Sequence, residues 1–196
     1  MADLLAGRVA AVLCSGTEVD REIAMALAEA GADIAIGTLH PSQEFATASI
    51  ANEVWAAGRQ QCSAVLSAGD PVALAAFAAE TVDRLGRCDL LVVSSPSPLT
   101  DLEGVSPSDW EESLHYALTV PLFAAQAFQP VIERDGGGWF VFVHGTGEGF
   151  IARLTAGTND LLAEQLGVAW SKRGLKVIAF PTDGAAEEIP LLFAPS

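Results

Sequence analysis

The stretch LCSGTEVDREIAMALAEAGADI, residues 13–34, decides the fold class of this chain. An apolar run of strand length leads into it, and an alanine-rich segment with the spacing of a helix, Glu18–Ala30, leads out. A buried strand, a short turn and a helix in this order are typical of the first unit of an α/β domain that binds a nucleotide. In this turn, however, Cys14, Glu18 and Asp20 stand where a phosphate-binding turn needs glycine.

Composition and charge narrow the classes of protein. The 196 residues, 51% of them apolar, fit a single domain over residues 1–196. A net charge of −15, with only ten lysines and arginines, argues against nucleic acid and anionic membranes as partners. No apolar run reaches the length of a membrane helix, and the start MADLLAGR does not resemble a signal peptide. We therefore expect a cytoplasmic protein.

Cysteine and histidine spacing gives no sign of a metal site. No Cys-x-x-Cys pair occurs, and no two histidines are four residues apart. We expect three buried free thiols and no bound metal. The residues concerned are Cys14, Cys62, Cys88, His40, His115 and His144.

Strand-like and helix-like segments alternate along the whole chain. The expected strands are residues 8–14, 34–37, 62–66, 89–94, 139–144 and 175–180. The expected helices are residues 18–30, 42–57, 70–85 and 154–172, and residues 106–134 are expected to form one or two further helices. Alternation of this kind predicts right-handed crossovers and a doubly wound parallel sheet of about six strands.

The order of landmarks resembles the short-chain dehydrogenase/reductase (SDR) family over about residues 5–184. The stretches that carry the resemblance are AGRVAAVL, REIAMALAEAGADI, RLGRCDLLVV, SDWEESLHYALTVPLFAAQA and GGGWFVFV. The resemblance implies a Rossmann-like fold, an NAD(P) cofactor and hydride transfer. It also implies that the chain is truncated after the sixth strand, where family members continue.

The cofactor positions of the family are altered in this sequence. The family's glycine-rich turn aligns with Leu13–Asp20, so its three glycines fall on Cys14, Glu18 and Asp20. Two carboxylates there are expected to repel a pyrophosphate, although acidic residues also favour the first turn of a helix. Further cofactor contacts of the family fall on residues 37–39, Ser67, residues 93–96 and residues 181–182, none of which matches. We expect this chain to bind no NAD(P) itself.

The catalytic positions of the family are altered as well. By the resemblance, the family's Asn, Ser, Tyr and Lys fall on Ala117, Gly145, Ala152 and Ala156. The only tyrosine is Tyr116, and no lysine precedes Lys172, so a Tyr-x-x-x-Lys pair cannot exist. General acid–base catalysis contributes typically 10²–10⁴-fold, so its loss would cripple hydride transfer.

The two long helices of the family's dimer contact are retained. In the family, the helices after the fourth and fifth strands pair across a two-fold axis. Phe123, Ala127, Leu162 and Trp170 could lie on the outward faces of these helices, although core packing explains each about as well. The expected partner is an active SDR subunit, which would hold NAD(P), or a second copy of this chain.

Several functions stay open at this stage. The first is a catalytically inactive, SDR-like subunit of an oxidoreductase complex, acting with an alcohol or hydroxyacyl-CoA dehydrogenase. The second is a cofactor-independent lyase, isomerase or hydrolase that uses the loop around His144, with Glu148 as its partner. A small-ligand-binding module in the altered cleft and a product without a selected role are the remaining readings. The segment 191–193, Leu-Leu-Phe, either folds back on the sixth strand or packs on another chain.

Overall fold

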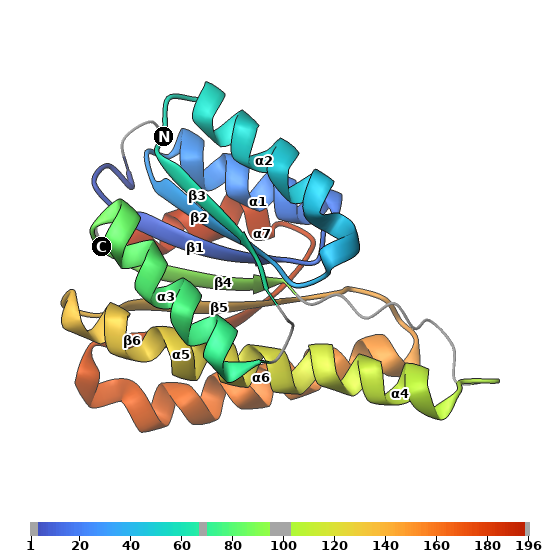
Figure 1. The fold of residues 1–196 in the computed structure, drawn as a ribbon. Helices are drawn as coiled ribbons and strands as arrows, with labels where there is room; N and C mark the ends of the chain where they lie inside the picture. Colours follow the sequence, from blue (N-terminus) through green and yellow to red (C-terminus); the bar gives the residue numbers. More distant parts are fainter. Residues whose placement is uncertain (1–3, 67–69, 95–102, 195–196) are drawn as a thin grey trace.

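The computed structural model describes residues 4–66, 70–94 and 103–194. Its centre is a six-stranded parallel sheet in the order β3-β2-β1-β4-β5-β6 (Figure 1). The strands are β1 Val9–Cys14, β2 Asp33–Thr38, β3 Gln61–Val65, β4 Leu90–Ser94, β5 Gly138–His144 and β6 Leu175–Pro181. The predicted doubly wound, Rossmann-like α/β fold is confirmed.

Helices cover both faces of the sheet. The α-helices are α1 Glu18–Glu29, α2 Glu44–Ala56, α3 Pro71–Leu85, α4 Pro107–Leu114, α5 Val120–Arg134, α6 Phe150–Trp170 and α7 Ala185–Glu188. The shorter helical turns are η1 Pro41–Gln43, η2 His115–Thr119, η3 Ser171–Arg173 and η4 Ile189–Phe193. Helices α1, α2 and α7 pack on one face, and α3, α5 and α6 on the other (Figure 1).

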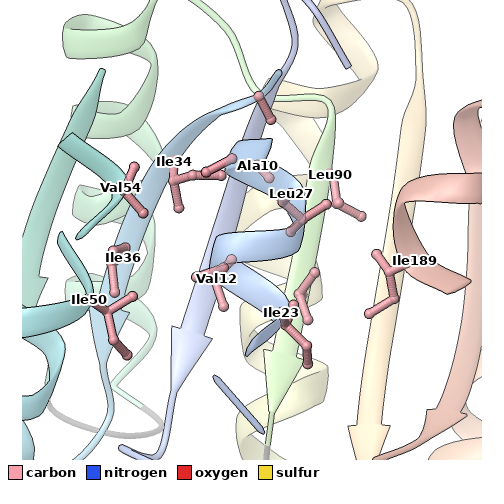
Figure 2. Close-up of a cluster of buried hydrophobic side chains, with 14 of the residues drawn as sticks. Ala10, Val12, Ile23, Leu27, Ile34, Ile36, Ile50, Val54, Leu90 and Ile189 are labelled. Atoms are coloured by element: carbon pink, nitrogen blue, oxygen red, sulfur yellow. The ribbon is translucent and has the colours of Figure 1, made fainter. Parts of the chain in front are cut away.

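Two apolar clusters, one on each face, explain why the central strands are apolar throughout. In β1, Ala10 and Val12 point to the cluster that contains Ile23 and Leu27 of α1 (Figure 2). Alternate residues of the same strand, such as Leu13, belong to the cluster on the other face. Burial on both faces is the usual state of a central strand in a parallel sheet.

The structure refines the expected elements in three places. The segment 106–134, expected as one or two helices, forms α4 and α5 with a π-helical stretch, His115–Thr119, between them. Helix α6 begins at Phe150, four residues before the expected start, and its N-cap Gly149 supplies no side-chain capping bond. The C-terminal segment does fold back: Leu192 and Phe193 pack against the cluster that includes Phe180 of β6, while η4 contacts α1.

The three cysteines are buried free thiols, as expected. Among the described helices, none combines the length and the apolar character needed to cross a membrane.

Candidate functional site

The point where the sheet order reverses lies between β1 and β4. The strands run β3-β2-β1 to one side and β4-β5-β6 to the other, so the winding reverses between β1 and β4. Ligands of open α/β sheets bind at such a point, outside the carboxyl ends of the strands. Here the Ser15 hydroxyl, just after β1, donates to the carbonyl oxygen of Ser94 at the end of β4, at 2.7 Å.

The turn after β1 is closed around the carboxylate of Asp20. Oδ2 of Asp20 accepts from the backbone N–H of Ser15 at 3.1 Å and from that of Thr17 at 2.7 Å. It also accepts from the Thr17 hydroxyl at 2.9 Å. Thr17 caps α1 and forms a reciprocal capping box with Asp20, the third residue of the helix. The side chain of Asp20 is therefore an integral part of the turn.

The two acidic residues of the turn lie in different environments. Asp20 is fully buried, whereas Glu18 is exposed and pairs with Arg21 at 2.9 Å. Arg21 also binds Glu53 of α2 at 2.7 Å. The two carboxylates therefore do not face the same site. Asp20 points into the turn, and Glu18 belongs to a surface network of ion pairs.

Burial changes the protonation chemistry of this turn. Desolvation raises the pKa of Asp20, while Ser94 and the groups of Thr17 and Ser15 that bond the carboxylate oppose the rise. Oδ1 of Asp20 and the Ser94 hydroxyl are both buried, and neither has a hydrogen-bond partner within the described residues. Burial, and then the nearby Asp20, raise the pKa of the Cys14 thiol well above its usual range. Cys14 is therefore an inert thiol and no candidate nucleophile.

The side chains of His40 and Gln43, which follow β2, fill part of the space at the carboxyl edge of the sheet. The side chain of Gln43 packs on Gly16, so closely that a Cβ added to Gly16 would lie 2.7 Å from it. The ring of His40 stacks on Tyr116 with a centroid distance of 4.3 Å, and the Tyr116 hydroxyl lies 3.0 Å from His40 Nδ1. The sequence reasoning missed both contacts, because each joins segments that no periodicity relates.

The family's catalytic positions lie on well-formed elements without reactive side chains. Ala117 is buried inside the π-helical stretch η2, a type of helix that is rare and occurs often at functional sites. Ala152 and Ala156 lie in the first two turns of α6, and Gly145 follows β5 directly. Ala117, Ala152 and Ala156 carry methyl side chains and Gly145 carries none, so these four positions have no acid–base group.

His144 contacts a different carboxylate from the one expected. Its Nε2 lies 3.9 Å from Oδ1 of Asp160 on α6, and its Nδ1 lies 3.2 Å from the carbonyl oxygen of Gly145. Glu148 is exposed, and no hydrogen bond or ion pair joins it to His144 in the part of the chain that the structure describes. His144 and Glu148 are therefore not brought together as a pair.

A groove runs along the outer face of α6. A cavity of about 490 Å³ lies between α6 and Leu118 of η2, and Arg153 and Leu154 connect it to a second cavity of about 430 Å³. The first cavity is lined by Leu118, Arg153, Leu154, Gly157, Thr158, Leu161, Leu162 and Gln165. Among the lining residues, Leu118 and Leu161 are exposed large apolar side chains.

The predicted interface residues lie mostly behind this groove. Phe123, Ala127, Leu162 and Trp170 are partly buried and pack against the core cluster, and only Leu162 also lines the groove. The more exposed apolar residues on α6 are Phe150, Leu161 and Val168. Their spacing along α6 is the signal in the sequence that could have identified them.

Some expected cofactor positions cannot be placed. Ser67, Ser95 and Pro96 lie outside the described residues.

Comparison with known proteins agrees with this fold. The chain is 29% identical to versicolorin reductase 1 of Aspergillus parasiticus over 68% of this chain and 50% of that one. It is 28% identical to an uncharacterized oxidoreductase of Mycobacterium tuberculosis over 76% of this chain and 58% of that one. The chain thus spans between half and three fifths of the length of these relatives.

A solved structure extends the likeness in fold over nearly the whole chain. It is that of a metagenomic short-chain oxidoreductase in complex with NADP, with a TM-score of 0.83 at 20% identity, covering 98% of this chain and 93% of that one. The family model for short chain dehydrogenases matches residues 8–150, most of the sheet and its helices. The chain therefore belongs to the short-chain dehydrogenase family.

Proposed function

We propose that this chain is a catalytically silent member of its family, acting as a subunit beside an active NAD(P)-dependent short-chain dehydrogenase. The observation that carries the proposal is the state of α6. The helix is complete from Phe150 to Trp170, yet Ala152 and Ala156 stand where the family resemblance expects the Tyr and Lys. The family scaffold is retained, and the groups that would exchange a proton with a substrate are absent from it.

The groove on α6 supports a role in association. It combines apolar lining with Arg153, whose guanidinium has no hydrogen bond or ion pair among the described residues. Arginine is enriched at the centres of protein–protein interfaces, where charged residues as a class are depleted. A subunit that uses this face would stabilise or shape the site of its partner, which would hold the NAD(P).

Native mass spectrometry of the protein isolated gently from its own cells tests this function. The expected result is a complex of fixed stoichiometry with a second short-chain dehydrogenase chain. The isolated chain, given NADH or NADPH with a panel of ketones and the oxidised cofactors with alcohols, is expected to show no turnover. Turnover by the chain alone, lost on heat unfolding, would overturn the proposal.

A second function is favoured by one contact, that of His144 Nδ1 with the carbonyl oxygen of Gly145. A neutral imidazole whose Nδ1–H is held by the Gly145 carbonyl keeps its Nε2 lone pair for a substrate, which is the arrangement of a general base. This would suit a cofactor-independent lyase, isomerase or hydrolase. His144→Ala would abolish such an activity, whereas an unchanged rate in this variant would dismiss it.

A further inference from the structure

The turn between β1 and α1 retains the geometry of an anion site. Backbone N–H groups that converge in the turn before a helix form an anion-binding concavity, and the helix dipole adds positive potential. In this chain the N–H of Ser15, in the turn, and that of the N-cap residue Thr17 both point at one atom, Oδ2 of Asp20. The anion at this helix terminus is thus a side chain of the helix itself.

The structure assigns to Asp20 the role of an intramolecular ligand that occupies the anion site of the turn and excludes phosphate groups from it. Asp20 thus determines which ligands the turn can bind, because one of its own oxygens takes the place of a phosphate oxygen. This inference deepens the proposed function, in that it gives a physical cause for the absence of a bound dinucleotide.

The surroundings of Asp20 indicate that its carboxylate fills the anion site of the turn and does not act only by repelling a phosphate. The carboxylate is fully buried. The other acidic residue of the turn, Glu18, is exposed and pairs with Arg21. The Gln43 side chain packs against Gly16 of the same turn.

Two variants separate occupancy from charge. Asp20→Ala removes the oxygen and leaves the N–H groups of Ser15 and Thr17 without their acceptor. Asp20→Asn removes the charge and keeps an acceptor oxygen of the same reach. The probe is inorganic pyrophosphate, and its binding is measured by isothermal titration calorimetry.

The expected result is that Asp20→Ala binds pyrophosphate at least about tenfold more tightly than the wild type. Asp20→Asn and the surface control Glu18→Ala are expected to remain at the wild-type level. If folded Asp20→Ala binds no better than the wild type, or if Asp20→Asn binds as well as Asp20→Ala, the assignment is wrong.

Amide hydrogen exchange of the wild type tests the inference even if Asp20→Ala does not fold. The N–H groups of Ser15 and Thr17 are expected to exchange slowly, as bonded groups do. Rapid exchange of both, at the rate of an open loop, would overturn the inference. Neither experiment depends on catalysis. Dehydrogenase activity of the isolated chain would refute the proposed function, whereas the role of Asp20 is decided by pyrophosphate binding and amide exchange alone.

Discussion

Asp89 shows how much of this fold depends on one buried carboxylate. Its side chain, only 1% exposed, accepts from Arg8 at 2.6 Å, from Arg87 at 2.5 and 2.7 Å, and from the backbone N–H of Val9 at 3.0 Å. It therefore connects the start of β1 to the start of β4. Removing a buried partner of this kind leaves other charged groups unsatisfied, which is more damaging than the loss of the pair itself.

Asp89→Ala is expected to destabilise the chain by about 2–3 kcal/mol. This is below the usual range for a fully buried pair, because Arg8 and Arg87 are 45% and 36% exposed and remain hydrated. Urea unfolding followed by circular dichroism measures the effect. The matched control is Glu80→Ala, which breaks the exposed pair with Arg84 and should change stability little; equal losses in both variants would contradict this account.

Asp20 should make stability depend on pH in the opposite sense to a salt-bridged carboxylate. Because burial raises the pKa of Asp20, the folded chain binds a proton at a pH where the unfolded chain has released it. Its contribution to the free energy of unfolding is full below the unfolded pKa of about 4 and is lost as the pH rises through the higher folded pKa. Asp20→Asn lacks this titration.

The unfolding free energy of Asp20→Asn relative to wild type should therefore rise as the pH increases from about 4 to 7. Urea unfolding of both proteins over this range gives the difference. A constant difference, or one that falls with pH, would show that the folded pKa of Asp20 is not raised.

At the scale of elements, two glycines, one in β5 and one in α6, are expected to have opposite effects when replaced. Gly138 begins β5, where a Cβ would lie 2.1 Å from the carbonyl oxygen of Asp89. Gly157 lies within α6, and a Cβ there would meet nothing within 4 Å. The first glycine is required by close packing of the backbone, whereas the second only loosens a helix.

Gly138→Ala is accordingly expected to lower the free energy of unfolding by about 1–3 kcal/mol, through steric strain in the sheet. Gly157→Ala should raise it by about 0.5–1 kcal/mol, because alanine favours the helix. Thermal and urea unfolding of the two variants measure both changes. A tolerated alanine at position 138 would mean that β4 and β5 are less closely packed than the structure has them.

The starts of helices could be predicted from the sequence where a capping residue marks them, and not where such a residue is absent. Asp70 and Pro71 marked the start of α3, where Asp70 caps the helix as expected. The start of α6 was placed late because Gly149 gives no capping side chain. The inward turn of Asp20 had a signal that was not used: Thr17 and Asp20 have the spacing of a capping box. The π-helical stretch η2 and the His40–Tyr116 contact have no such local signature, because they depend on packing between distant segments.

At the scale of the whole molecule, the residues that hold the sheet together and the positions that differ from the family's pattern lie in different places. The clusters that stabilise the sheet lie on its two faces, whereas the altered positions lie at the carboxyl edge and the first turns of α6. On the proposed function, the absence of reactive groups at these positions costs little apolar burial, so the fold persists without the chemistry. The groove on α6 is not required to hold the sheet together. Substitutions there therefore test the function without unfolding the chain.

Leu161→Arg tests whether that groove binds another subunit. Leu161 is 58% exposed, so the variant should keep its stability to within about 0.5 kcal/mol. Because an unpaired arginine at the centre of an apolar interface would have to be desolvated, the complex with the second dehydrogenase chain should be lost in native mass spectra. The control is Trp55→Arg, a 71% exposed position of α2 on the opposite face of the sheet, which should leave the complex intact. If Leu161→Arg keeps the complex and Trp55→Arg loses it, association uses the face of α1 and α2, and the groove has another role.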